Sequence, residues 1–191
     1  MDVCLIRHTT PSVGRGICYG QSDVALAASF EQEAYALWRS LEAKTQGAVT
    51  PVRIVTSPLQ RCRLLADFLK GKIPKSTLVF DDRLQELSFG DWEGHPWSEI
   101  EKHTYFAVWM NDFVNVACPG GESYCELASR AQECLQHWSN QPERTVLVTH
   151  AGVIRALLAY QLGISLEQSF ELPVNYGDVF HLTDSSVMTA L

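Results

Sequence analysis

The chain has 191 residues, of which 46% are hydrophobic and 19% are charged, as in an ordinary globular protein and not in a disordered or repetitive one. The formal net charge of -7 argues against nonspecific binding to nucleic acid or to anionic membranes, because both need broad basic surfaces. The N-terminus lacks a signal-peptide pattern, and no apolar stretch reaches the roughly 18 residues that a spanning helix needs. We therefore expect one soluble, cytoplasmic domain over residues 1–191, as a monomer or homodimer.

The first strand is predicted at residues 3–6, a continuous apolar run of the kind that is buried on both faces of a sheet. Helical patterns follow over residues 29–42, from Ser57 and Pro58 through Leu69, and over 122–138. Similar apolar runs predict strands at 52–55 and 145–148, with further strands at 79–80, 179–182 and 187–191. This alternation predicts an α/β fold, a three-layer α/β/α sandwich with a mostly parallel central sheet.

The six cysteines show no C-x-x-C spacing and lie at Cys4, Cys18, Cys62, Cys118, Cys125 and Cys134. The chain is also too long to need a disulfide framework, so we expect reduced thiols. A structural zinc site is the alternative, but zinc ligands usually come in close pairs. We expect neither a metal nor another cofactor.

Polar residues follow the predicted parallel strands at their carboxyl ends, where open sheets of this kind have their functional crevice. His8, Arg61 and His150 each come just after such an end, so we expect them to converge on one pocket. The stretch 96–110 is rich in aromatic residues, which more often form core than a platform for ligands.

These residue types suit phosphoryl transfer, which needs cations around the phosphate oxygens, a nucleophile in line and a proton donor for the leaving oxygen. Arg7 and Arg61 can bind phosphate through bidentate hydrogen bonds, and His150 would add a third positive donor if it were protonated. His8 is the candidate nucleophile, because the charges of the two arginines keep its imidazole neutral. Each residue alone has a simpler interpretation as a solvated strand end or a surface cation, and only the combination favours catalysis.

Glu86 is the candidate general acid, with Asp91 and Glu93 as weaker alternatives. It lies in an aromatic, glycine-rich stretch from Leu84 to Gly94. Desolvation there raises the pKa of a carboxyl group, while nearby arginines lower it, and the sequence leaves the balance open.

Five segments in order resemble motifs of the histidine phosphatase (phosphoglycerate mutase-like) superfamily. They are Leu5 to Thr10 (resembling R-H-G-x-T), Ser57 to Arg61 (S-x-L-x-R), Leu84 to Gly94 (L-x-E-x-x-F-G-x-W-E-G), Pro119 to Ser123 (P-G-G-E-S) and Val148 to Val153 (V-x-H-x-G-V). The resemblance covers nearly the whole chain. It implies a phosphohistidine at His8, a phosphate pocket of Arg7, Arg61 and His150, and Glu86 as the proton donor. It extends the candidate substrate-binding residues to Thr9, Gln21, Ser22 and Ala151.

Two departures from the pattern bear on this site. Thr9 stands where the family has glycine, and a close approach of that backbone to His8 would make Thr9 shift the imidazole. The family asparagine is not evident, and Gln21 or Ser22 is expected to donate to the phosphate in its place.

The combination R-H-T-x-P with C-Y-G-Q-S-D is most similar to the α-ribazole phosphatase branch. The implied reaction is hydrolysis of the small-molecule phosphomonoester α-ribazole 5′-phosphate in cobalamin nucleotide-loop assembly. The alternatives are a phosphoglycerate mutase, a sugar (bis)phosphatase or a broad-specificity phosphatase. A non-catalytic phosphate-binding module and a metal-dependent hydrolase are the remaining alternatives.

Overall fold

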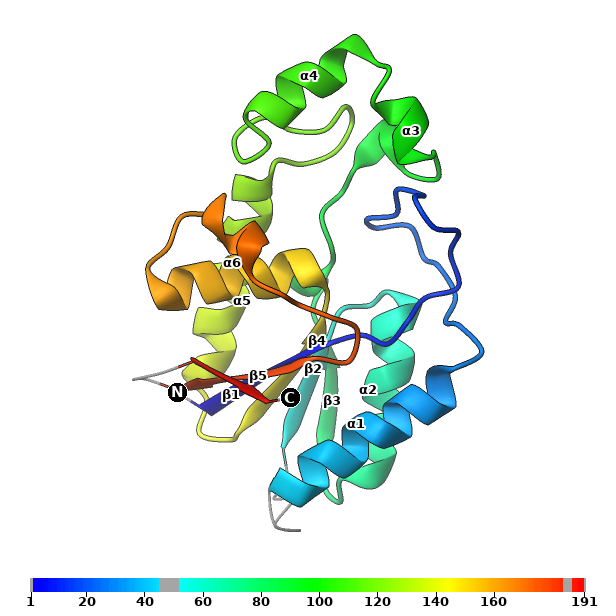
Figure 1. Cartoon of the computed structure of the whole chain (residues 1–191). Coiled ribbons are helices and arrows are strands. Elements are labelled where there is room, and N and C mark those ends of the chain that lie inside the picture. Colours follow the sequence, from blue (N-terminus) through cyan, green and yellow to red (C-terminus); the bar gives the residue numbers. More distant parts are fainter. Residues whose placement is uncertain (1, 45–51, 184–186, 191) are drawn as a thin grey trace.

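The computed structural model describes residues 2–44, 52–183 and 187–190, and its centre is a six-stranded sheet (Figure 1). The strands are β1 (Asp2–Arg7), β2 (Arg53–Thr56), β3 (Thr77–Phe80), β4 (Thr145–Thr149), β5 (Val179–Thr183) and β6 (Val187–Ala190). They follow the order β3-β2-β4-β1-β5-β6, in which the first four run parallel and the last two pair antiparallel. The mostly parallel sheet predicted from the sequence is therefore confirmed, while residue 191 of the last predicted strand lies outside the described residues.

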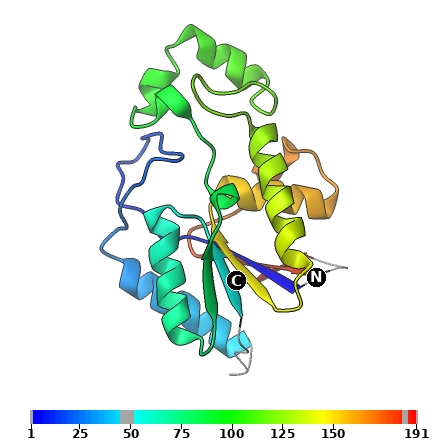
Figure 2. The same cartoon turned by 180° about the vertical axis from the view of Figure 1, so that it is seen from behind.

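Two helices cover each face of the sheet, as Figures 1 and 2 show from opposite sides. Alternate residues of β1 explain this, because successive side chains of a strand point to opposite faces. Cys4 and Ile6 pack with α1 (Phe30–Lys44) and α2 (Gln60–Lys72). Val3 and Leu5 pack with α5 (Tyr124–Ser139) and α6 (Ala151–Leu162). An apolar run without alternation thus corresponds to a strand that is buried on both faces.

Helix α2 begins later than the sequence predicts, at Gln60 and not at Pro58. Leu59 is still extended, with φ -63° and ψ 136°, so the helix begins after it. The Ser57 hydroxyl lies 2.9 Å from Nε2 of His150 and accepts from the Leu59 nitrogen at 3.4 Å. Ser57 therefore holds a site residue and does not cap the first turn of the helix. Helix α5, by contrast, starts with a complete capping box between Ser123 and Glu126.

The aromatic stretch forms two short helices, α3 (Trp97–Ile100) and α4 (Thr104–Asn111), which lie beyond the carboxyl ends of the parallel strands (Figure 1). Their buried residues Ile100 and Trp109 form, with Cys18, Trp92 and Cys118, a cluster separate from the two that flank the sheet. Single turns of 3₁₀ helix, η1 (Asp82–Leu84), η2 (Gly90–Trp92) and η3 (Gln168–Glu171), complete the chain.

All six cysteines are among the described residues and none of them forms a disulfide; five are buried, whereas Cys125 is exposed. Within the described ranges no helix has the length and apolar character needed to cross a membrane.

Candidate active site

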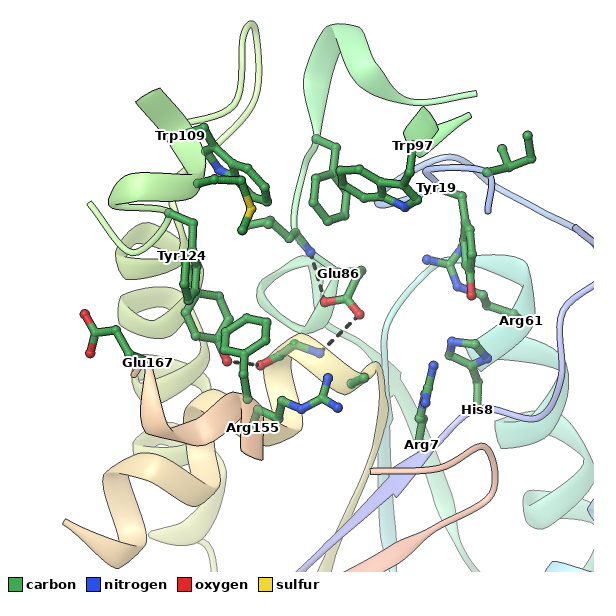
Figure 3. Close-up of a pocket in the computed structure, with 18 residues that line it drawn as sticks. Arg7, His8, Tyr19, Arg61, Glu86, Trp97, Trp109, Tyr124, Arg155 and Glu167 are labelled. Carbon is green, nitrogen blue, oxygen red and sulfur yellow. Dashed lines mark hydrogen bonds between the residues drawn. The ribbon is translucent and has the colours of Figure 1, made fainter. Parts of the chain in front are cut away.

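A cavity of about 510 Å³ opens between the carboxyl ends of the strands and the α3–α4 segment (Figure 3). Five of the residues singled out from the sequence line it, namely Arg7, His8, Arg61, Glu86 and Ala151. They come from the end of β1, the first turn of α2, the loop after η1 and the start of α6. The expected convergence of distant strand ends on one pocket is therefore observed for these residues.

His8 has a defined tautomer. Its Nδ1 lies 2.7 Å from the carbonyl oxygen of Thr9, and because a carbonyl can only accept, Nδ1 carries the hydrogen and Nε2 keeps its lone pair when the ring is neutral. Burial is the largest cause that lowers the pKa of His8, to about 3; the hydrogen bond to Thr9 opposes it, and the charges of Arg61 and Arg7 add to it. The imidazole is thus neutral near pH 7, as the sequence analysis expected, but mainly because it is desolvated.

Arg7 is held along one edge of its guanidinium group. Its Nη1 donates to the Val174 carbonyl at 2.6 Å, and its Cζ lies 3.9 Å from the centre of the Tyr176 ring. Its Nε is buried and, within the described structure, has no hydrogen-bond partner. A buried unpaired donor is costly, so an anion that accepts from this nitrogen would be bound favourably here.

Arg61 is fully buried, and three of its N–H groups make bonds within the described structure. Nη2 donates to the Gly20 carbonyl at 2.6 Å, Nη1 to the Ser22 carbonyl at 2.8 Å, and Nε to Nδ1 of His150 at 3.3 Å. A guanidinium group has five N–H donors, so part of this cation remains for a ligand in the cavity that it lines.

His150 is fully buried beside Arg61 and is not one of the residues that line the cavity. Its Nδ1 accepts from Arg61, so Nε2 carries the hydrogen of the neutral ring and can donate to Ser57. Burial, followed by the charges of Arg61 and the neighbouring His8, holds the pKa of His150 well below its usual value. The condition under which His150 would be a third positive donor is therefore not met; its ring packs edge to face against His8, with ring centres 5.1 Å apart.

Glu86 faces the same cavity as Arg7 and His8 (Figure 3). One carboxylate oxygen accepts from the Leu87 nitrogen at 3.1 Å and the other from the Gly152 nitrogen, in the first turn of α6, at 3.2 Å. Arg130 fixes the backbone beneath it by donating to the carbonyl of Glu86 at 3.0 Å. Glu86 is thus a positioned carboxyl group beside the predicted nucleophile.

Gln21, Ser22 and Thr9 do not line the cavity. The Gln21 amide donates to the Glu86 carbonyl at 3.1 Å, and the Ser22 hydroxyl donates to the Glu93 carboxylate. These two side chains hold loops together, so the expectation that one of them donates to the phosphate is not met in this structure. Thr9 is fully buried and contributes its carbonyl to His8.

Asp91 and Glu93, the two alternatives to Glu86 as the general acid, do not face the cavity. The Glu93 carboxylate accepts from the backbone nitrogens of Gln21 at 2.8 Å, Ser22 at 2.6 Å and Phe89 at 3.1 Å. Asp91 is exposed to solvent, and neither residue lines the cavity.

Sequence reasoning missed a further cation in the cavity, Arg155. It belongs to α6, and its Nε donates to the Leu172 carbonyl at 3.2 Å. The available signal was an arginine that interrupts an apolar helix four residues after Ala151, which puts both residues on one helix face.

The opposite wall of the cavity is apolar and mostly aromatic. Its residues come from the loop after β1, residues 87–113, the start of α5 and η3: Ile17, Leu87, Phe89, Trp97, Trp109, Met110, Phe113, Tyr124 and Phe170. Tyr19 also lines the cavity, beside Arg61. Trp97 and Trp109 stack with ring centres 6.2 Å apart. The aromatic stretch therefore forms both core and cavity wall.

The cavity thus combines two arginines, a neutral imidazole and a carboxyl group at one end with an aromatic wall at the other. Such a set can bind a phosphate group, attack it and protonate a leaving oxygen. Among the described residues, no group of three or more His, Cys, Asp or Glu side chains is placed to hold a metal ion.

Comparisons with known sequences and structures found similar proteins, among them the following three. A candidate phosphoserine phosphatase of Hydrogenobacter thermophilus is 30% identical over 172 residues, covering 88% of this chain and 82% of that protein. The glucosyl-3-phosphoglycerate phosphatase of Mycobacterium tuberculosis is 31% identical over 169 residues, covering 81% of this chain and 72% of that protein. The crystal structure of a candidate alpha-ribazole-5′-P phosphatase from Escherichia coli has a TM-score of 0.85 at 22% identity, covers 99% of this chain and 94% of that one, and supports the fold.

The sequence profile of the histidine phosphatase superfamily (branch 1) matches residues 3–186, which is nearly the whole chain. This agrees with the five motifs, with the α/β fold and with the cavity at the strand ends. The chain therefore belongs to the histidine phosphatase superfamily, and it is a phosphatase.

Proposed function

We propose that the protein hydrolyses phosphomonoesters through a phosphohistidine at His8. The observation that carries this proposal is the bond from Nδ1 of His8 to the Thr9 carbonyl, because it leaves the lone pair on Nε2 of a neutral imidazole beside Arg7 and Arg61. In the first step Nε2 forms a bond to phosphorus and the ester P–O bond breaks, while the carboxyl of Glu86 gives its proton to the leaving oxygen. In the second step water attacks phosphorus, Glu86 takes a proton from that water, and the P–N bond breaks.

The aromatic wall supports an alcohol with a large flat ring system. We propose α-ribazole 5′-phosphate as the substrate, hydrolysed during assembly of the cobalamin nucleotide loop. Its benzimidazole can stack on rings such as Trp97 and Trp109, and stacking of a base on an aromatic side chain contributes about 1–3 kcal/mol. The name of the Escherichia coli protein agrees with this choice.

Arg155 favours a second candidate class, phosphorylated hydroxy acids. Its guanidinium group lines the cavity and could pair with a carboxylate next to the phosphate ester. Phosphoserine and glucosyl-3-phosphoglycerate, which the names of two relatives mention, both carry such a carboxylate.

The central test compares His8→Ala with His103→Ala, a control at an exposed histidine outside the cavity. We expect His8→Ala to lose at least about 10³-fold in turnover, since a covalent step is removed, and the control to keep full activity. Rapid quenching of the parent with ³²P-labelled substrate should trap acid-labile phosphate on the protein. Unimpaired hydrolysis by His8→Ala would contradict the proposal.

A substrate panel tests the alcohol. We expect kcat/KM for α-ribazole 5′-phosphate to exceed that for phosphoserine and 3-phosphoglycerate by at least about tenfold. The reverse order, together with a loss in Arg155→Gln that is confined to the two acids, would favour the second class.

A further inference from the structure

Two tyrosines from distant segments meet beside the arginines of the phosphate end. Tyr19 lies in the loop after β1 and Tyr176 in the turn before β5, and their hydroxyl oxygens are 2.8 Å apart. Burial and the contact with Tyr176 raise the pKa of Tyr19, and one of the two hydroxyl groups donates to the other. The pair bridges two segments that are 157 positions apart in the chain.

The ring of each tyrosine lies near one arginine. The Cζ atom of Arg7 is 3.9 Å from the centre of the Tyr176 ring, and that of Arg61 is 5.5 Å from the centre of the Tyr19 ring. Both distances fall within the range in which the face of an aromatic ring attracts a guanidinium group. The contact of Tyr176 with Arg7 is the closer and therefore the stronger of the two.

The turn that carries Tyr176 is bonded to the end of β1. The Gly177 nitrogen lies 3.2 Å from the Arg7 carbonyl and 3.3 Å from that of His8, and the Arg7 nitrogen donates to the Asp178 carbonyl at 3.0 Å. Val174, in the same segment, accepts from Nη1 of Arg7. The segment from Val174 to Asp178 therefore fixes the backbone of Arg7. It also contacts one edge and one face of the Arg7 guanidinium group.

Tyr176 also packs beside the candidate nucleophile. Its ring centre is 5.5 Å from that of His8, whose exposed fraction is only 2%. The Nε of Arg7, the donor without a partner in the described structure, is buried in the guanidinium group that lies against this ring. One ring thus contacts the cation and the imidazole that would meet the phosphate group.

We propose that Tyr19 and Tyr176 are positioning residues: their hydroxyl bridge holds the Tyr176 ring against Arg7, and that ring keeps the guanidinium group oriented for phosphate. This proposal rests on the phosphate site of the proposed function. It makes Tyr176, a residue outside the catalytic set, a determinant of phosphate affinity for every ester.

The test is direct binding of inorganic phosphate, measured by titration calorimetry and as competitive inhibition of p-nitrophenyl phosphate hydrolysis. Tyr176→Leu removes the aromatic face, and we expect phosphate to bind about tenfold more weakly. Tyr176→Phe keeps the ring but deletes the hydroxyl bridge, so it should weaken phosphate binding only about threefold. Tyr160→Leu, which changes a tyrosine that is 51% exposed on α6, is the matched control and should bind phosphate as the parent does.

A double-mutant cycle tests the bridge itself. Tyr19→Phe and Tyr176→Phe each delete the same hydrogen bond, so the double variant should bind phosphate no more weakly than either single variant. Single variants that bind phosphate as the parent does, or effects that multiply in the double variant, would overturn the bridge. Equal phosphate affinity of Tyr176→Leu and the parent would overturn the positioning role, whereas a parent that binds no phosphate would instead end the proposed function.

Discussion

Replacement of Gly152 by alanine should test proton donation by Glu86 to the leaving oxygen. Gly152 is the second residue of α6, and its nitrogen donates to the Glu86 carboxylate. A Cβ at this position would collide with the other oxygen of that carboxylate, so the Glu86 side chain must move. The substitution therefore displaces the proposed acid without changing its chemistry.

The effect on stability should be small because two contributions oppose each other. Alanine is favoured over glycine inside a helix by up to about 1 kcal/mol. Rotation of Glu86 out of its present conformation costs about 0.5–1.5 kcal/mol. For a chain of this size we expect the Tm to change by less than about 4 °C, which thermal unfolding can check.

The effect on turnover should depend on the leaving group. A positioned general acid contributes about 10²–10⁴-fold, so we expect kcat/KM on an alkyl phosphate, which reports the first step and not hydrolysis of the phosphohistidine, to fall at least about 100-fold. p-Nitrophenolate leaves without protonation, and the loss on p-nitrophenyl phosphate should stay below about tenfold. Glu86→Gln should show the same contrast between the two substrates.

Gly71→Ala is the matched control, because an added Cβ at this position in α2 meets nothing within 4 Å. It should raise stability by up to about 1 kcal/mol and leave kcat unchanged on both substrates. Unchanged kcat/KM of Gly152→Ala on the alkyl phosphate, or equal losses of kcat/KM on the two substrates, would refute the role of Glu86 as the proton donor.

Three further predictions follow from burial, stacking and capping. The lowered pKa of His8 means that between pH 6.5 and about 3 the unfolded chain binds a proton that the folded chain does not. The free energy of unfolding, measured with urea, should therefore fall on acidification. In this range it should fall by about 1.4 kcal/mol per pH unit more than that of His8→Asn. Trp97→Leu should raise KM for the benzimidazole nucleotide about tenfold and leave inhibition by inorganic phosphate unchanged, as steady-state kinetics can measure. Ser123→Ala removes the capping box of α5 and should lower the Tm by about 2–4 °C in a thermal melt without affecting kcat.

The phosphate end of the cavity could be predicted from the sequence because its residues lie in short sequence motifs, most of them at the ends of predicted strands. Arg7 and His8 directly follow a strand that is apolar on both faces, and Glu86 stands in a motif of several fixed positions. Parallel strands bring their carboxyl ends to one edge, so such residues converge whatever the packing elsewhere. This is why five predicted residues line the cavity.

Other features depended on side-chain partners that no local pattern specifies. His150 was predicted at the correct strand end, but its ring is bonded to Ser57 and Arg61 and does not line the cavity. Gln21 and Ser22 carry donors suited to phosphate, yet Glu93 and the backbone of Glu86 engage them. Such preferences are decided by which partner lies within hydrogen-bonding distance once the chain has folded.

The two ends of the cavity are built in different ways, and this has a consequence for how substitutions act. At the phosphate end, backbone hydrogen bonds fix the side chains: the His8 nitrogen donates to the Thr149 carbonyl at 3.0 Å, which ties the end of β1 to β4. At the aromatic end, rings such as Trp109 pack mainly within their own cluster, apart from the sheet. A change at the first end must alter turnover of every ester, because all share the phosphate group, whereas a change at the second can alter one alcohol relative to another.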